Sequence, residues 1–257
     1  MFTFSPLQLG KGNRHLIAFH GAGQSPDVFR SWKSLFEEWT IWAFPLVPTS
    51  PLPNQENYRP TTFLCQFRQW LTGQSFERFS LLGYSLGAKP IYFLASYFPQ
   101  RIEHLYLLAP EGIFPNIWYH WATRSTWGRA FFSSIVRYPV FFNNFIRLGK
   151  ELGLISAQTA RTAKASFRSA SCAQKLWREW MLWRNFDKPH FFESMVTCHQ
   201  LPISLVLAKN DTIIPNTRLA EWAEKIPSCR VYWLESSHEK LLSTFKHYIL
   251  QKAKVNI

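Results

Sequence analysis

The stretch Phe79-Ser-Leu-Leu-Gly-Tyr-Ser-Leu-Gly87 decides the fold, because an apolar run leads directly into a serine between two glycines. The run predicts a buried strand, and Gly83, Ser85 and Gly87 fit G-x-S-x-G on a sharp strand-to-helix turn. Glycine at the flanking positions lets neighbouring backbone approach closely, where a Cβ has no room. Such a turn presents the serine hydroxyl at its apex, so Ser85 is a candidate nucleophile. The pentapeptide also occurs by chance, and the alternative is a tight turn with an ordinary serine.

A candidate acid follows a second apolar run. Residues 203–208 are short and largely apolar, which is typical of a buried parallel strand. Asp211 lies just beyond this run, where it would stand at the strand's carboxyl end. It could instead only cap the following helix or close a turn. Glu111, which follows the preceding strand, is the rival acid, and we favour Asp211.

His238 completes the set. It directly follows the strand-like run at 230–234 and precedes a helix-like segment. The chain order is therefore serine, acid, histidine, which is the order that accompanies a G-x-S-x-G turn. Ligands bind outside the carboxyl ends of the strands in an open parallel sheet. We therefore expect Ser85, Asp211 and His238 to meet at one edge of the sheet.

A glycine-rich loop upstream offers an oxyanion site. The strand-like run at 15–19 leads into His20-Gly-Ala-Gly23. The amide of Ala22 in this loop and the amide of Leu86, directly after the serine, are the candidate donors. Leu86 also lies at the amino end of the new helix, where the helix dipole favours negative charge. We expect His20 to hydrogen bond within the loop rather than to act as a base.

Through these four segments the chain resembles the α/β-hydrolase superfamily. The resemblance implies an α/β fold with a mostly parallel central sheet covered by helices on both faces, and a helical lid inserted after the sixth family strand. It implies a serine hydrolase that cleaves a carboxylic ester or thioester through an acyl-enzyme on Ser85, with Asp211 and His238 as partners. No metal or organic cofactor is required for that reaction.

The resemblance leaves other activities open. Relatives use the same triad for acyl transfer or for cleavage of a carbon-carbon bond, and a non-catalytic ligand-binding member of the fold is a further alternative. The epoxide hydrolase and dehalogenase branches would require an aspartate at position 85. The serine found there argues against them.

The strand pattern divides the chain into two parts. Residues 1–112 and 201–257 alternate strand-like and helix-like segments, which predicts the α/β-hydrolase core. Residues 113–200, which we call the insert, lose this rhythm and are predicted to form a helical lid. The core pattern predicts strands at 2–9, 16–19, 41–44 and 105–108 and helices at 25–39, 62–71 and 85–98. Pro90 predicts a bend or a locally loosened turn in the last of these helices, and we expect Lys89 to face solvent.

The insert is basic. It holds 12 Lys or Arg against 4 acidic residues, and this difference of plus 8 makes up most of the chain's net charge of plus 13. Such a surface attracts an anionic carrier, such as coenzyme A or acyl-carrier protein, or an anionic membrane surface. A solvated basic face is the plain alternative. We expect no nucleic-acid partner, because no nucleic-acid-binding module is recognisable.

The insert is also rich in aromatic residues, which can line an acyl pocket or simply pack the insert helices against one another. The nine that we single out are Trp118, Tyr119, Trp121, Trp127, Phe131, Phe132, Phe141, Phe142 and Phe145. An aromatic pocket would favour medium or longer apolar acyl groups on the substrate.

Composition agrees with one domain and a lid. The chain has 257 residues, and 47% of them are hydrophobic, which is ample for a core of this size. Its four cysteines have no metal or redox spacing, which favours a reducing compartment. No secretory signal and no apolar run of about 20 residues is visible. We therefore predict a soluble, cytoplasmic protein.

Overall fold

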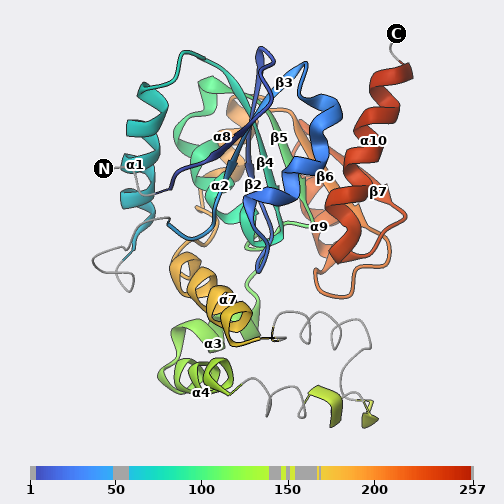
Figure 1. The fold of residues 1–257 in the computed structure, drawn as a ribbon. Helices are drawn as coiled ribbons and strands as arrows, with labels where there is room; N and C mark the ends of the chain where they lie inside the picture. Colours follow the sequence, from blue (N-terminus) through green and yellow to red (C-terminus); the bar gives the residue numbers. More distant parts are fainter. Residues whose placement is uncertain are drawn as a thin grey trace.

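A twisted sheet forms the centre of the molecule (Figure 1). The computed structural model describes residues 4–48, 58–138, 146–148, 151–153, 167 and 169–255. These residues form a seven-stranded sheet in the order β1-β3-β2-β4-β5-β6-β7. Within this described part, β1 pairs antiparallel to β3, and the remaining pairs are parallel. The predicted mostly parallel α/β fold is confirmed.

The two strands that lead to Ser85 and Asp211 are buried along their whole length, whereas β7, which leads to His238, is partly exposed. Every residue of β4 and β6 is buried, as expected for parallel strands covered on both faces. The bounds are β1 (Leu7–Leu9), β2 (Arg14–Phe19), β3 (Trp39–Phe44), β4 (Phe79–Tyr84), β5 (Ile102–Leu108), β6 (Ile203–Ala208) and β7 (Cys229–Leu234). The strand predicted at 2–9 is shorter than expected, because residues 4–6 form no ladder and residues 1–3 lie outside the described part.

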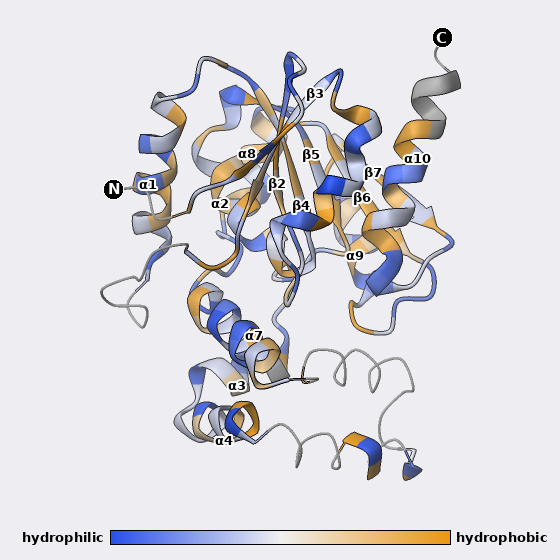
Figure 2. Cartoon of the chain, in the orientation of Figure 1, coloured by the Kyte–Doolittle hydropathy of each residue, from blue (hydrophilic) through white to orange (hydrophobic). Residues whose placement is uncertain are grey.

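Helices cover both faces of the sheet. One face carries α1 (Pro60–Thr72), α2 (Ala88–Tyr97), α8 (Phe192–Cys198) and α9 (Asn216–Ala223), and the other carries the 3-10 helix η1 (Pro26–Leu35) and α10 (Leu241–Val255). The rings of Trp32 in η1 and Phe245 in α10 lie 6.4 Å apart, which joins the second pair. Figure 2 shows that hydrophobic residues are concentrated in the strands between these two layers.

Two of the predicted helices differ from the structure. The helix predicted at 25–39 ends at Leu35, because the chain turns there and Trp39 already pairs with Arg14 in the sheet. The bend predicted at Pro90 is not required, since α2 begins at Ala88. Proline in a first turn costs no hydrogen bond, because N–H groups there have no partner within the helix.

The described part of the insert is mostly helical. The helices α3 (Ile117–Arg124), α4 (Thr126–Arg137) and α7 (Ala170–Trp183) lie together below the ends of the strands in the view of Figure 1. They pack around their own small hydrophobic cluster, which includes Phe132 and Leu176. Leu182 and Trp183 at the end of α7 and the two buried residues of α8, Phe192 and Val196, belong instead to the main core. Whether these helices act as a lid stays a prediction, and so do the domain boundaries.

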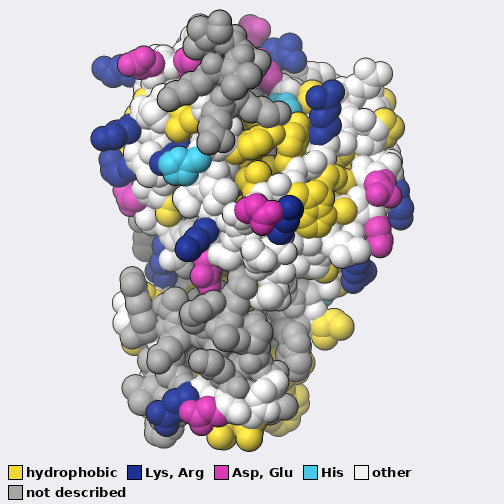
Figure 3. Space-filling model, turned by 90° about the vertical axis from the view of Figure 1, so that its right-hand side faces the viewer, with side chains coloured by type: hydrophobic (Ala, Val, Ile, Leu, Met, Phe, Trp, Pro, Cys, Tyr) yellow, Lys and Arg dark blue, Asp and Glu magenta, His cyan; other side chains and the backbone are white. Residues whose placement is uncertain are grey.

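The outer edge of the sheet has an apolar surface. Figure 3 views the side of the molecule that carries β7 and α10 and shows hydrophobic side chains gathered there. Trp233 of the edge strand β7 is among the exposed large hydrophobic side chains. No helix of the described residues is both long and apolar enough to cross a bilayer.

Candidate functional site

Ser85 lies where β4 ends and the 3-10 turn η3 (Ser85–Gly87) begins. Its φ is 53°, in the left-handed region that residues with a Cβ rarely adopt. A Cβ on Gly83 would lie 2.7 Å from the backbone of α2, and one on Gly87 would lie 2.4 Å from the Phe19 carbonyl oxygen. Ser85 therefore lies in a strained strand-to-helix turn, residues 83–87, which we call the elbow. This turn requires glycine on both sides of the serine.

Ser85, His238 and Asp211 form one line of contacts. His238 Nε2 lies 3.2 Å from Ser85 Oγ, and His238 Nδ1 lies 2.7 Å from Asp211 Oδ2. The three residues come from the carboxyl ends of β4, β6 and β7, so the parallel sheet brings them to one edge, as expected. Ser85 is 8% exposed and the Asp211 side chain is fully buried.

The hydrogen bonds determine which ring nitrogen carries the proton. An ionised carboxylate only accepts, so His238 Nδ1 donates to Asp211. The lone pair of Nε2 then faces the Ser85 hydroxyl, which is the arrangement that a general base requires. The other oxygen of Asp211 accepts from the backbone amides of Ile213 and Ile214 at 2.8 and 3.1 Å, which fixes the carboxylate.

Short contacts hold the loops of the site together. Tyr84, next to the serine, donates its hydroxyl to the His238 carbonyl at 2.5 Å. The backbone N–H of Asn210 donates to the Ser236 carbonyl at 3.1 Å, which joins the loop that carries Asp211 to the loop that carries His238. The segment around the histidine is thus fixed from two strands at once.

The rival acid occupies a different position. Glu111 donates its backbone N–H to the Ser85 carbonyl at 3.1 Å, so it adjoins the elbow. The hydrogen bond to His238 Nδ1, however, comes from Asp211. Burial raises the pKa of Glu111, and the charges of Lys89 and His238 oppose the shift. The geometry therefore favours Asp211 as the partner of the histidine.

The loop after β2 lies beside the elbow. Leu86 is the residue directly after the serine in η3, and Gly21 packs against Tyr84, since a Cβ there would lie 2.8 Å from its ring. His20 Nδ1 contacts the Gly21 carbonyl at 2.8 Å, so His20 bonds within the loop, as predicted. Burial lowers the pKa of His20 to about 4, which keeps it neutral. The Ala22 and Leu86 amides stay candidate oxyanion donors.

Lys89 is fully buried, so the expectation that it faces solvent is wrong. Its ammonium lies 4.3 Å from the centre of the Tyr119 ring and 3.5 Å from the Trp183 carbonyl. The insert thus covers this side of α2. Burial lowers the pKa of Lys89. Among the described residues, no carboxylate lies within 4.0 Å of its Nζ.

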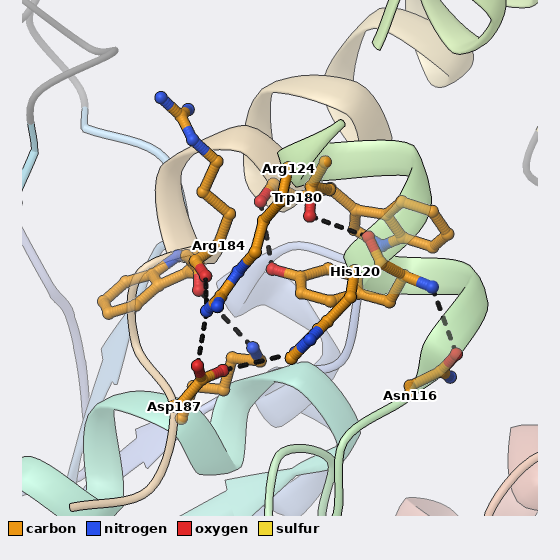
Figure 4. A network of polar contacts seen from close by, with 10 residues as sticks. Asn116, His120, Arg124, Trp180, Arg184 and Asp187 are labelled. Carbon is orange, nitrogen blue, oxygen red and sulfur yellow. Dashed lines mark hydrogen bonds and ion pairs between the residues drawn. The ribbon is translucent and has the colours of Figure 1, made fainter. Parts of the chain in front are cut away.

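A pocket of about 170 Å³ lies next to Lys89, between the insert and the end of β5. Figure 4 shows the polar network beside it, in which His120 lies 3.4 Å from Asp187 and Arg124 also pairs with Asp187. Arg124 further donates to the Arg184 carbonyl at 2.8 Å. These contacts tie α3 to the segment that follows α7. Within the described part of the chain, no cluster of His, Cys, Asp or Glu is placed to hold a metal ion.

The predicted acyl-pocket aromatics have different environments. Tyr119 lines the pocket, whereas Phe132 is buried inside the cluster of the insert. Trp127 is 82% exposed, and Trp121 and Phe131 are also exposed. The remaining predictions lie outside what the structure describes, namely Phe141, Phe142, Phe145 and the side chain of Trp118. Most of the described aromatic residues therefore do not line this pocket.

Comparison with known proteins agrees with the geometry. The family model of the alpha/beta hydrolase fold matches residues 14–240. The chain belongs to the α/β-hydrolase family. The match spans both the elbow and the segments that carry Asp211 and His238. A search of curated proteins found no significant sequence match.

Solved structures of this family are similar over nearly the whole chain. A bromoperoxidase from Bacillus anthracis has 18% identity and a TM-score of 0.65, with 98% of this chain and 95% of that chain covered. The enol-lactonase from Burkholderia xenovorans LB400 has 14% identity and a TM-score of 0.65, covering 96% and 95%. A thioesterase domain from the curacin biosynthetic pathway has 15% identity and a TM-score of 0.62, covering 95% and 93%. At these identities the likeness shows the fold alone.

Sequence reasoning missed the contacts made from the insert. Glu179 of α7 is fully buried and bonds to Gly23 in the loop after β2, across 156 positions of sequence. The one available signal was its isolation as an acid in a basic segment. Neither Lys89 nor Tyr84 carried a signal, because their partners are backbone carbonyls and rings that only the fold brings near.

Proposed function

We propose that the protein is a serine hydrolase that cleaves a carboxylic ester or thioester through an acyl-enzyme on Ser85. The observation that carries the proposal is the line from Ser85 Oγ to His238 Nε2 at 3.2 Å and from His238 Nδ1 to Asp211 at 2.7 Å. The left-handed backbone at Ser85 supports it further, because strain of this kind is characteristic of functional sites.

In the proposed reaction Ser85 Oγ attacks the carbonyl carbon while His238 Nε2 takes the hydroxyl proton. The tetrahedral intermediate collapses, the bond to the leaving alcohol or thiol breaks, and His238 returns the proton to that group. Asp211 holds the imidazole in the required tautomer and stabilises the charge that it acquires. Water, activated by His238 in the same way, then releases the acid from Ser85.

The amides of Ala22 and Leu86 are the proposed donors to the oxyanion. Each donor in a comparable site lowers the barrier by about 3 to 4 kcal/mol, because negative charge develops on the carbonyl oxygen only during the reaction. Leu86 is supported as a donor by its place directly after the nucleophile in η3. Ala22 is supported by the position of its loop against Tyr84.

We propose an anionic partner for the insert. The helix α4 exposes Trp127 and Phe131, and Arg129 and Arg137 belong to the same helix. Aromatic and arginine side chains on one helix are suited to the headgroup region of an anionic membrane or to an acidic carrier such as acyl-carrier protein. Sedimentation with vesicles containing anionic lipid, against neutral vesicles, tests the first. Faster turnover of carrier thioesters than of simple esters tests the second.

The deciding experiment is hydrolysis of p-nitrophenyl esters and acyl-coenzyme A thioesters of graded chain length, beside Ser85→Ala. We expect turnover by the wild-type protein and a loss of several orders of magnitude in the variant. Thermal stability should be nearly unchanged. Wild-type turnover in Ser85→Ala would remove the nucleophile assignment. Lack of both turnover and fluorophosphonate labelling in the folded protein would favour a binding role.

A further inference from the structure

The loop that follows β2 is held from outside by the insert. Within the loop, the backbone N–H of Gln24 donates to the Gly21 carbonyl at 3.2 Å. The backbone N–H of Gly21 donates in turn to the side-chain oxygen of Gln24 at 3.1 Å. These two bonds close the turn without using the amide of Gly23. That amide donates instead to Glu179 Oε2 at 2.6 Å, and Glu179 lies in α7.

Lys175 adds a second contact from the same helix. Its ammonium donates to the Gln24 carbonyl. Residues four apart share one face of a helix, so Lys175 and Glu179 present a donor and an acceptor together. The Ala22 side chain also packs against the hydrophobic cluster of the insert. The insert therefore contacts the loop both through polar groups and through an apolar surface.

Burying the carboxyl group of Glu179 at this position costs free energy. Its side chain is fully buried, and Oε1 lies 3.7 Å from Lys175 Nζ with no hydrogen-bond partner among the described residues. Burial raises the pKa of Glu179 to about 7, although the bond from Gly23 and the charge of Lys175 oppose the shift. Burying an ionised carboxylate costs free energy unless its oxygens are well paired, and within the described part of the chain only Oε2 accepts a hydrogen bond, from the Gly23 backbone amide. The contact with the loop is therefore kept in spite of this cost.

We propose that Glu179 and Lys175 are positioning residues, which fix the backbone of residues 21–24 so that the Ala22 amide faces the developing oxyanion. The inference rests on the proposed function. Its consequence is that the oxyanion site is complete only while α7 is docked on the loop. The chemistry at Ser85 is thereby coupled to the position of the insert, and not only to residues of the sheet.

The coupling should affect the chemical step more than substrate binding. The oxyanion carries its charge in the transition state, so a displaced amide raises the barrier without weakening the ground-state complex. A group that acts only by stabilising the fold would lower the melting temperature and leave the kcat of the folded fraction unchanged. The ratio of the effects on kcat and KM therefore separates the two roles.

The test compares Glu179→Leu, Glu179→Gln and Lys175→Met with the wild-type protein. Arg178→Met is the matched control, because Arg178 is an exposed cation on the same helix. The measurements are kcat and KM for a p-nitrophenyl ester, melting temperature, and hydrogen exchange at the amide of Gly23. We expect Glu179→Leu to lower kcat by about 10- to 100-fold with KM within about twofold, and to speed exchange at Gly23. Glu179→Gln keeps an acceptor for this amide, so its kcat should fall less. Arg178→Met should match the wild type in kcat and in exchange at Gly23.

Three results would contradict the inference in different ways. Faster exchange at Gly23 with unchanged kcat would overturn the positioning role, and unchanged exchange in Glu179→Leu would overturn the contact itself. Lack of Ser85-dependent turnover in the wild-type protein would remove the proposed function, and with it the oxyanion role. The exchange measurement is independent of catalysis, so the last failure is distinguishable from the first two.

Discussion

Tyr84 donates its hydroxyl to the backbone carbonyl of His238 at 2.5 Å, so the strand residue before the nucleophile holds the histidine loop. Its ring lies 5.5 Å from the imidazole, which adds a packing contact. The position of the candidate base is thus set from β4 as well as from β7. The same tyrosine packs against Gly21, so one side chain contacts both loops that flank Ser85.

The Tyr84→Phe substitution removes this hydrogen bond while retaining the ring. We expect a loss of about 1 kcal/mol in the free energy of unfolding, typical of one buried hydrogen bond. We expect kcat to fall by about tenfold, because the imidazole is less well positioned. Denaturant unfolding and ester kinetics measure the two effects. A variant with full activity would show that the His238 loop keeps its place without Tyr84.

The elbow itself can be tested at Gly87. An alanine Cβ there would lie 2.4 Å from the Phe19 carbonyl oxygen and 2.5 Å from the His20 carbonyl oxygen, and backbone atoms cannot move aside. We expect Gly87→Ala to be poorly folded or inactive, with a loss of at least about 3 kcal/mol in stability. Gly73→Ala is the control, because its Cβ would meet only the Trp70 carbonyl at 3.4 Å. Equal stability of the two variants would contradict the crowded elbow.

The acid can be assigned by comparing Asp211→Asn with Glu111→Gln. Asparagine would offer its amide to His238 Nδ1 and favour the wrong tautomer, so we expect kcat to fall by about 10³- to 10⁴-fold. Glu111→Gln should cost far less, because its carboxylate makes no hydrogen bond to the histidine. Steady-state kinetics on one ester suffice, with circular dichroism as the control for folding. The reverse ranking would assign the acid to Glu111.

The local sequence predicted the elements that carry the site. The apolar runs before Ser85 and Asp211 form the strands β4 and β6, as predicted. Parallel strands place their carboxyl ends at one edge, so the predicted position of each candidate residue directly after a strand was enough to bring the three together. The helix predicted through residue 39 was wrong, because pairing of Trp39 with Arg14 overrides local propensity.

The contacts between the insert and the core could not be predicted from the sequence. Lys89 was expected in solvent because lysine is rarely buried, yet the Tyr119 ring and the Trp183 carbonyl cover it. Glu179 reaches Gly23 only because α7 docks on the loop. Such contacts depend on the packing of segments distant in sequence, for which neither periodicity nor a motif gives a signal.

Replacing Lys89 by an apolar residue should stabilise the protein. Its burial lowers its pKa, so the folded state binds the proton less tightly than the unfolded state does. The contribution of Lys89 to the free energy of unfolding therefore rises as the pH increases toward the usual lysine pKa. At pH 7 this contribution is lower. We expect Lys89→Met to raise the unfolding free energy at pH 7 by about 1 to 3 kcal/mol, because a buried charge without a carboxylate partner is removed. A destabilised variant at this pH would show that the ammonium is well compensated.

Glu179 gives the opposite dependence of stability on pH. Burial raises its pKa from 4.5 to about 7, so the folded state binds the proton more tightly than the unfolded state does. Stability from this group is fully present below pH 4.5 and is lost as the pH rises through about 7, by up to about 3 kcal/mol. Glu179→Gln cannot ionise, so the wild-type protein should lose stability relative to it across this window. Denaturant unfolding of both proteins at several pH values measures the difference, and parallel curves would mean that the buried carboxyl does not change its pKa on folding.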